Sequence, residues 1–251
     1  MRAMILAAGL GKRARPLSDE IPKPLFPLAE LPLIAYPLGL LKAAGITEIV
    51  VNVHHHADQI ERVLGQYRDA GLDIAISREE HLLETGGGIA NARRYLGDGT
   101  FVVINGDVIC DIDLTAVIDD HRHSGAIATM VIRENPDPTF YSVVEWDTCS
   151  QGIVDIRGEL GRKTPFSRAV MFTGIHVIEP TVFDYLLPTR ESIIDGFYLP
   201  ALREYRHVHG HFHDGYWADL GTIEQYQRTR EEMKARALSH LQPLTPTAAR
   251  A

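Results

Sequence analysis

The sequence predicts an α/β fold in which a mixed, mostly parallel sheet carries helices on both faces. Short apolar runs of strand length alternate with longer segments whose apolar residues recur at helical spacing. The first of these runs, residues 3–8, is apolar throughout and ends at Gly9, which is typical of a strand buried on both faces. The resulting β-α-β-α-β order implies parallel strands joined by crossover helices.

Each element predicted in the first half has its own pattern. Residues 33–44 are apolar enough for a buried helix, and Gly45 suits the left-handed position that follows a helix end. Apolar residues between 60 and 67 recur at helical spacing, and residues 89–96 are expected to form a further helix. The second, third and fourth strands are predicted at residues 48–53, 72–76 and 100–104.

The second half of the chain is richer in strands. A charged helix is expected from about Ile223, because Thr222 and Gln225 have the spacing of a capping box. The strands are predicted at residues 126–133, 142–146, 152–156 and 169–178.

Length and composition indicate one globular domain. The chain has 251 residues, of which 45% are hydrophobic and 23% charged, as is usual for a protein with a large core. We expect a single domain over residues 1–238. Residues 239–251 combine prolines with small residues, so a flexible C-terminal tail is expected there.

The charge and cysteine content exclude several classes of partner. A formal net charge of -8 argues against binding to nucleic acid, so an anionic ligand would need a local cluster of cations. The two cysteines, Cys110 and Cys149, are too few for a disulfide framework and fit a reducing compartment. The apolar start is too short for a signal peptide, and no apolar run has membrane-spanning length. We therefore expect a cytoplasmic protein with no membrane partner.

A glycine-rich basic segment follows the first predicted strand. Gly9 and Gly11 leave room for a polyanion to approach the backbone, and their amides can cradle phosphate oxygens. The cations of this segment are Lys12, Arg13, Arg15 and Lys23. Asp107 follows the fourth strand, and parallel strands present their carboxyl ends at one edge of a sheet. The sequence therefore predicts a phosphate site at that edge.

Other interpretations of this segment are weaker. A Walker A loop would need Gly-Lys-Ser/Thr, which the chain lacks here. The dinucleotide fingerprint fits only superficially at Gly9, Gly11 and Ala14, because Pro16 interrupts the helix that should follow. The second strand also has no acid at its end, which argues against a dinucleotide-dependent oxidoreductase. An exposed basic loop without a ligand is the remaining alternative.

Residues 6–17 and 22–25 closely resemble the signature of sugar-1-phosphate nucleotidyltransferases. These enzymes join a nucleoside triphosphate to a sugar 1-phosphate and release pyrophosphate. Further segments resemble the family's second nucleotide loop, its two metal motifs and its sugar-site strand, and together the matches cover most of residues 2 to 236. The resemblance implies the Rossmann-like nucleotide-diphospho-sugar transferase fold. The further segments are residues 84–88, 105–107, 217–222 and 172–175.

The resemblance implies a role for each matching residue. Arg13 and Lys23 are implied to be catalytic, with Arg13 on the leaving pyrophosphate and Lys23 on the attacking phosphate. Asp107 and Asp219 are implied to hold Mg²⁺, the cofactor, whose preferred ligands are hard oxygens. The sugar phosphate-binding positions are Lys23, Asn105, Gly174 and Trp217. The nucleotide-binding positions are Ala8, Gly9, Gly11, Lys12, Arg13, Glu84, Thr85, Gly86 and Gly87.

Structural roles for the charged residues stay open at this point. Asp107 could be an ordinary turn residue, Asp219 a solvated acid before a helix, and Lys23 a surface lysine in a proline-bounded turn. A catalytically silent paralogue that binds nucleotide sugars is a further alternative, but the intact charged set argues against it. No general base is expected, because a phosphate nucleophile is already anionic.

The resemblance is nearest to the N-acetylmuramic acid 1-phosphate uridylyltransferase branch, which implies UTP as the nucleotide and a cell-wall or polysaccharide precursor as the product. The alternatives are GTP with mannose or heptose 1-phosphate, and CTP with a small phospho-alcohol. Two departures concern the sugar site. Residues 157–165 stand where many members have Glu-Lys-Pro, and Ser142 stands where many have glycine. The sequence does not indicate an oligomeric state.

Two conspicuous features are expected to be structural. Histidines at alternate positions from 207 to 213 would share one side of a strand, so a polar sheet face near the ligand cleft is favoured over a metal site. The run at residues 54–56 is expected to form a solvated turn at a strand end. Cys110 is expected to be a small packing residue rather than a nucleophile.

Overall fold

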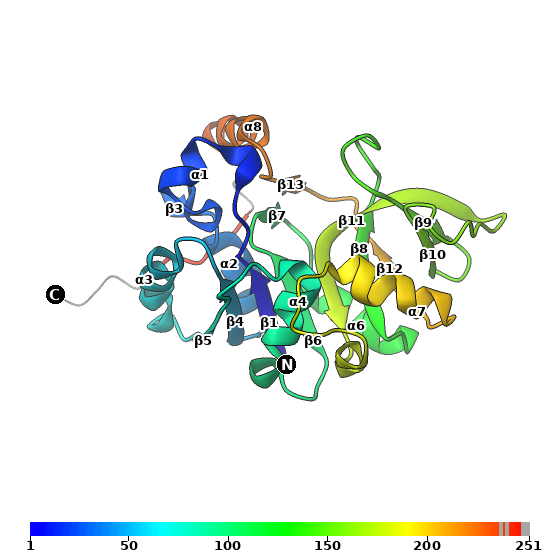
Figure 1. The fold of residues 1–251 in the computed structure, drawn as a ribbon. Coiled ribbons are helices and arrows are strands. Elements are labelled where there is room, and N and C mark those ends of the chain that lie inside the picture. The colour runs from blue at the N-terminus through cyan, green and yellow to red at the C-terminus, as the bar shows by residue number, and fades with distance from the viewer. Residues whose placement is uncertain (236–237, 239–240, 247–251) are drawn as a thin grey trace.

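The computed structural model describes residues 1–235, 238 and 241–246, and it is built around one large mixed sheet (Figure 1). The strand order is β10-β9-β11-β6-β1-β4-β5, with β8 pairing β11 and β12 pairing β8. The bounds are β1 (Arg2–Leu6), β4 (Glu48–Val53), β5 (Asp73–Arg78), β6 (Phe101–Asn105), β8 (Ala128–Arg133), β9 (Val143–Asp147), β10 (Ile153–Ile156), β11 (Ser167–Ile178) and β12 (Val208–Phe212).

The parallel part of the sheet brings several strand ends to one edge. Strands β6, β1, β4 and β5 all run in the same direction, and Leu6 is in register with both Asn52 and Asn105. Strand β11 pairs antiparallel with β6, and it also pairs with β8 and β9 of the second half. The predicted mixed, mostly parallel sheet is therefore confirmed, and the segments after β1 and β6 begin side by side.

Helices cover both faces of the sheet, as predicted. One apolar core lies between the sheet and α2, α3 and α6, and a second lies between the opposite face and α4, α5 and α7. The helix bounds are α1 (Leu17–Glu20), α2 (Ala35–Ala43), α3 (Ala57–Arg68), α4 (Glu84–Asn91), α5 (Arg93–Leu96), α6 (Leu114–Ser124), α7 (Leu199–Arg203) and α8 (Ile223–Lys234).

Short elements connect these layers. Two antiparallel pairs, β2 with β3 and β7 with β13, lie outside the main sheet. Their bounds are β2 (Pro27–Leu28), β3 (Leu31–Pro32), β7 (Val108–Cys110) and β13 (Trp217–Asp219). The single helical turns are η1 (Lys12–Ala14), η2 (Lys23–Leu25), η3 (Pro180–Asp184) and the π-helical η4 (Ile194–Tyr198).

The prediction for residues 84–96 was wrong in its boundaries. A helix was expected only from Ile89, with a loop before it, whereas α4 begins at Glu84 and ends at Asn91, and α5 follows separately. Glycines disfavour a helix in isolation, but here the segment around Glu191 packs against them and accepts their amide hydrogens. Helix α6 was not predicted, although Asp113 caps it by accepting hydrogen bonds from the Thr115 and Ala116 amides.

The C-terminal part follows the sequence pattern up to α8. The predicted capping box is confirmed, because Thr222 and Gln225 each accept a backbone hydrogen bond from the other. Of the predicted tail, residues 241–246 lie against α2, where the Leu244 amide donates to the Ala35 carbonyl over 2.9 Å. Residues 239–240 and 247–251 lie outside the described residues.

The alternating histidines contact acids on other elements. Ring nitrogens of His209 and His211 lie 3.0 and 2.8 Å from the same carboxylate oxygen of Asp120 on α6. His213 lies 3.2 Å from Asp111. This strand therefore packs against α6. Among the described residues no group of three or more His, Cys, Asp or Glu side chains is arranged so that it could hold a metal ion. Burial raises the pKa of the Cys110 thiol to about 12, as expected for a packing residue.

A buried amide connects the ends of the parallel strands. Asn52 near the end of β4 accepts a hydrogen bond from the Ala7 amide over 2.7 Å and donates to the Glu79 carboxylate over 2.7 Å. Glu79 follows β5 and also accepts from the Leu83 amide at the start of α4, over 3.0 Å. Asn52 and Glu79 are both buried, so each bond satisfies a group that water does not reach.

We predict that Asn52→Ala lowers the free energy of unfolding by roughly 2–4 kcal/mol, because it leaves a buried amide hydrogen and a buried carboxylate without this partner. Urea denaturation followed by circular dichroism measures the change. Gln66→Ala, on the exposed side of α3, is the matched control and should stay within about 0.5 kcal/mol of the parent. Equal stabilities of the two variants would contradict this role for Asn52.

Candidate active site

The glycine-rich segment after β1 is an open turn at the carboxyl edge of the sheet. No atom lies within 4 Å of the position that a Cβ on Gly9 would occupy, so the backbone there is open to a ligand. Gly11 has a φ of 62°, and a Cβ there would lie 2.7 Å from the Ser18 side chain. Ser18 donates to the Gly11 carbonyl over 2.8 Å. Gly11 is thus required for the turn itself, while Gly9 faces open space and Ala8 is buried beside it.

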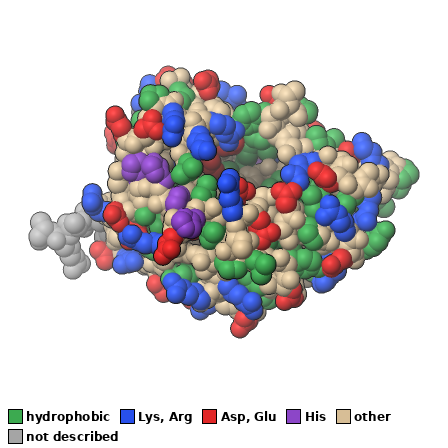
Figure 2. Space-filling view, viewed as in Figure 1, with side chains coloured by type: hydrophobic (Ala, Val, Ile, Leu, Met, Phe, Trp, Pro, Cys, Tyr) green, Lys and Arg blue, Asp and Glu red, His purple; other side chains and the backbone are tan. Residues whose placement is uncertain are grey.

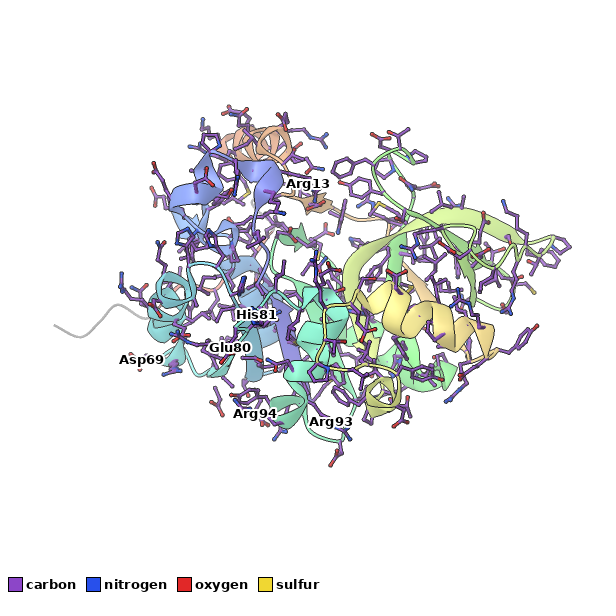
Figure 3. The ribbon with its side chains drawn as sticks, viewed as in Figure 1. Arg13, Asp69, Glu80, His81, Arg93 and Arg94 are labelled. Carbon is purple, nitrogen blue, oxygen red and sulfur yellow. The ribbon has the colours of Figure 1, made fainter. Side chains whose placement is uncertain are left out.

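The Arg13 guanidinium reaches from η1 towards the second half of the molecule. It lies 5.1 Å from the centroid of the Phe140 ring. A Cβ on Gly221 would lie 2.9 Å from Arg13 Nη2 and 3.0 Å from both carboxylate oxygens of Asp219. Figure 3 shows Arg13 on the side of the molecule that carries α1 and α8, next to β13. Arg13 and Asp219 are therefore neighbours across Gly221, and Lys12 beside Arg13 is exposed.

Lys23 forms an ion pair with Asp107. Only 11% of the Lys23 side chain and 27% of the Asp107 side chain are exposed, so solvent screens this pair less than a surface pair. Lys23 begins η2 between two buried prolines, Pro22 and Pro24, and the Leu25 amide donates to the Pro22 carbonyl over 2.8 Å. Prolines restrict the backbone on both sides of Lys23.

Asp219 completes the charged group. Strand β13 places Asp219 opposite Val108, and the Leu220 amide donates to the Asp107 carbonyl over 3.0 Å. Burial and then the negative charge of Asp107 raise the pKa of Asp219 to about 6, while Lys23 and Arg13 act in the opposite direction. The four charged residues that the sequence singled out therefore lie within electrostatic reach of one another.

Three further predicted residues, from β6, β11 and β13, are connected by close contacts. A Cβ on Gly174, whose φ is 84°, would lie 2.4 Å from Asn105 Nδ2, so glycine leaves the space that this amide fills. The Trp217 indole donates to the carbonyl of Thr173, the residue before Gly174, over 3.0 Å. Asn105 ends β6, Gly174 lies within β11 and Trp217 begins β13.

The residues predicted to form the second nucleotide loop are occupied by contacts within the chain. The Gly86 and Gly87 amides donate to the Glu191 carbonyl over 2.9 and 3.2 Å, and Thr85 accepts a hydrogen bond from the Ile193 amide over 2.8 Å. Glu84 forms an ion pair with Arg190 over 2.8 Å. These amides therefore hold the segment before η4 against α4 rather than pointing at an open site.

Two cavities meet at Asp219. One, of about 540 Å³, lies between β13, α8 and the loop that follows β8, and the other, of about 400 Å³, extends from Arg13 to β10 and η4. Figure 2 shows a hollow in this region with lysine and arginine side chains on its rim. Phe140, Tyr141 and Asp219 line both cavities, and neither is lined by residues 84–88.

Sequence patterns did not single out all of the residues around the site. Asn52 is a polar residue near the end of a largely apolar strand, a signal that could have been used, whereas Glu79 follows a strand of mixed polarity. Phe140, Ser192 and Asp195, which line the second cavity, lie in segments without a distinctive pattern, and only the packing of the chain brings them to Arg13.

The acid pair fits a hard divalent cation. Asp107 and Asp219 supply carboxylate oxygens from adjacent positions, and each raises the cost of charge on the other in the absence of a counterion. Two carboxylates do not fill an octahedral shell, and the part of the chain that the structure describes holds no larger cluster of potential ligands here. The remaining ligands would have to be substrate oxygens and water.

A comparison with family models gives one match that spans nearly the whole chain. The model described as Nucleotidyl transferase matches residues 2–236. Among solved structures, a putative glucose-1-phosphate thymidylyltransferase from Bacillus anthracis, in complex with a sucrose, has a TM-score of 0.79 at 24% identity, covering 92% of this chain and 94% of that one. At this identity the likeness establishes the fold.

The names of the curated relatives include different substrates. N-acetylmuramate alpha-1-phosphate uridylyltransferase of Neisseria meningitidis serogroup B is 38% identical over 230 residues, which cover 89% of this chain and 94% of that protein. UTP–glucose-1-phosphate uridylyltransferase of Synechocystis is 32% identical, covering 96% of this chain and 66% of the relative. Mannose-1-phosphate guanyltransferase of Candida albicans is also 32% identical, covering 90% of this chain and 62% of that relative. The last two relatives are therefore considerably longer than the matched region.

None of the helices among the described residues has both the length and the apolar character needed to cross a membrane.

We predict that Gly87→Ala lowers the free energy of unfolding by roughly 1–3 kcal/mol, since its Cβ would lie 1.8 Å from the Thr189 carbonyl oxygen and would push this segment off α4. Gly65→Ala is the matched control, because this exposed glycine within α3 has no neighbour within 4 Å of a Cβ. It should stabilise the protein by about 0.5–1 kcal/mol. Thermal unfolding of both variants measures the contrast, and stabilisation by both would refute the close packing at Gly87.

Proposed function

Because this chain belongs to the nucleotidyl transferase family, we propose that it is a sugar-1-phosphate nucleotidyltransferase that uses Mg²⁺, and that its substrates are UTP and N-acetylmuramic acid 1-phosphate. The observation that carries this proposal is the cluster of Arg13, Lys23, Asp107 and Asp219 at one edge of the sheet. Two cations and two acids at one place suit a reaction in which two polyanions meet.

The proposed reaction is a substitution at the α-phosphorus of the nucleotide. An oxygen of the sugar phosphate forms a bond to that phosphorus, the bond to the bridging oxygen of the β-phosphate breaks, and pyrophosphate leaves with the electron pair. The attacking phosphate is already an anion, so no side chain has to remove a proton. The main tasks are to position the two phosphates and to neutralise their charge.

Arg13 and Lys23 divide these tasks. The Arg13 guanidinium offers a planar set of donors that suits the β- and γ-phosphate oxygens, which become the leaving group. The Lys23 ammonium is a compact charge, held among prolines and nearly buried, that would lower the repulsion between the attacking phosphate and the α-phosphate. The ion pair with Asp107 holds this ammonium within the charged cluster.

Asp107 and Asp219 would hold Mg²⁺ together with phosphate oxygens. The bound ion would neutralise phosphate charge and help to align the two substrates. Their carboxylates have the ligand chemistry that this ion prefers, and their contacts across β7 and β13 keep them together. Open backbone at Gly9, together with Ala8 and Gly11, would receive the nucleotide.

The choice of UTP and the acidic sugar is supported by the Neisseria relative, which matches this chain over 94% of its own length. A guanylyl transfer to mannose 1-phosphate is the second candidate, and the Candida and Mycobacterium tuberculosis relatives at 32% identity favour it. Both reactions would use the same four charged residues and would differ at the base and sugar.

Incubation of the protein with Mg²⁺, each nucleoside triphosphate and a panel of sugar 1-phosphates tests these candidates through pyrophosphate release. We expect the highest kcat/KM with UTP and N-acetylmuramic acid 1-phosphate. A higher value with GTP and mannose 1-phosphate would favour the second candidate, and no release with any pair would refute the proposed activity.

Lys23→Ala and Asp107→Ala are each expected to lower turnover at least ~100-fold, the range for loss of a preorganised electrostatic contact. Pyrophosphate release under saturating substrates measures the effect, and circular dichroism checks that the variants are folded. Lys42→Ala serves as the control, because this lysine lies on α2 and donates to the Ala70 carbonyl. Near-normal turnover in both folded site variants would contradict the assignment.

A further inference from the structure

The 400 Å³ cavity has an apolar wall and a polar rim. It extends from Arg13 and Asp219 at one end to the segment after β10 and the start of η4 at the other. The apolar wall consists of Val144, Ile156, Phe172 and Ile194, and the polar rim includes Ser142, Arg157, Ser192 and Asp195. A pyranose ring could lie along such a wall with its phosphate towards the charged cluster, so the far rim would meet its substituents.

Arg157 is placed on that rim by a tight turn. It follows β10 directly, with a φ of 60°, and Gly158 has a φ of 72°. The Arg157 amide donates to the Val143 carbonyl over 2.8 Å, which holds the turn to β9. A left-handed conformation at a non-glycine residue is uncommon and costs free energy, so the surrounding contacts must hold it.

Asp195 holds the Arg157 guanidinium and leaves part of it available. Arg157 Nη2 donates to one carboxylate oxygen of Asp195, and Ser192 donates to the other. These two bonds lower the pKa of Asp195, so it stays ionised. Arg157 Nη2 also lies 3.8 Å from a carboxylate oxygen of Glu159. Among the described residues no hydrogen bond partner is found for Arg157 Nε or Nη1. The guanidinium is therefore fixed in place with donors to spare.

The element that carries Asp195 is itself anchored. The His176 ring on β11 lies 2.7 Å from the Tyr198 hydroxyl at the end of η4. Burial lowers the pKa of His176 to about 3, so this contact does not change with pH near neutrality. The contact between β11 and η4 keeps the Asp195 side chain at the rim.

Arg13 and Arg157 are the cations that line this cavity. Lys163, six residues after Arg157, forms an ion pair with Glu145 and has 71% of its side chain exposed, so it does not contribute to the lining. Arg13 is assigned above to the pyrophosphate. Arg157 is thus the cation that remains for the sugar, at the end of the cavity away from the phosphates.

We propose that Arg157 determines specificity by binding a carboxylate on the sugar, such as the lactyl group of N-acetylmuramic acid. The inference rests on the proposed function, because it takes this cavity as the sugar site. A guanidinium fork matches a carboxylate in shape and charge, and the bond is strengthened in a partly buried setting. Asp195 is then a positioning residue, and Ile156 and Phe172 pack against the sugar.

Three sugar 1-phosphates that differ at one group test this role with UTP and Mg²⁺. They are N-acetylmuramic acid 1-phosphate, its lactyl methyl ester and N-acetylglucosamine 1-phosphate. In the parent protein we expect kcat/KM for the acid to exceed that for the ester by about 10- to 100-fold, mainly through KM, as a charge-assisted pair would give. The ester keeps nearly the volume of the acid, so the ratio isolates its charge.

Arg157→Gln should reduce the ratio of kcat/KM for the acid to kcat/KM for the ester to near one. It should leave kcat/KM for the ester within about threefold of the parent value. Arg157→Lys, which keeps the charge but loses the fork, should give an intermediate ratio. Arg122→Gln on α6, an exposed arginine that pairs with Asp119, is the control and should keep the parent ratio. Calorimetric titration of each variant with the acid and the ester gives the same comparison without turnover.

The outcomes separate the two proposals. Pyrophosphate release at equal rates from acid and ester, or an equal loss for both in Arg157→Gln, would overturn the role of Arg157 and leave the nucleotidyltransferase function standing. Release only with other nucleotide and sugar pairs would refute the proposed substrates. In that case the role of Arg157 would also be overturned if calorimetry showed equal affinity for the acid and the ester, or no binding of either.

Discussion

The buried amide of Asn52 is the contact on which the arrangement of the site depends. It joins the backbone after β1 to the carboxylate that follows β5, and that carboxylate in turn binds the start of α4. Each of these segments leaves the sheet at the same edge. A side chain that carries both a donor group and an acceptor can satisfy both neighbours at once, which neither a carboxylate nor an apolar residue could do in this position.

A second constraint is electrostatic. Asp107 and Asp219 are held together by the β7–β13 pairing, and their mutual repulsion is offset by Lys23 and Arg13. The cations come from the N-terminal segment, whereas one of the acids comes from the last strand. The charged cluster therefore forms only when the N-terminal segment and β13 have folded against the same sheet. Its two cations and two acids suit a site where two polyanions meet.

The glycines of the predicted nucleotide loops have two different structural roles, which their sequence pattern does not distinguish. Glycines at residues 9, 11, 86 and 87 all suggest loops that bind phosphate, but their surroundings are different. Gly9 faces open space, and Gly11 makes a left-handed turn against Ser18. Gly86 and Gly87 instead allow the segment before η4 to lie against α4, with their amides bonded to Glu191. A glycine needed for close packing and one needed for a ligand look the same in a sequence.

The sequence alone determined the sheet class, the strand ends that carry Gly9 and Asp107, and the α8 cap, because these depend on local periodicity and on residue types with few alternative roles. The four charged residues were indicated by the resemblance of their motifs to a known family. The tertiary structure decided the start of α4, the contacts of His209 and His211 with Asp120, and the cavity that joins Phe140, Arg157 and Asp195 to Arg13. These residues are far apart in the chain, and no local pattern records which of them will meet when separate segments pack on one sheet.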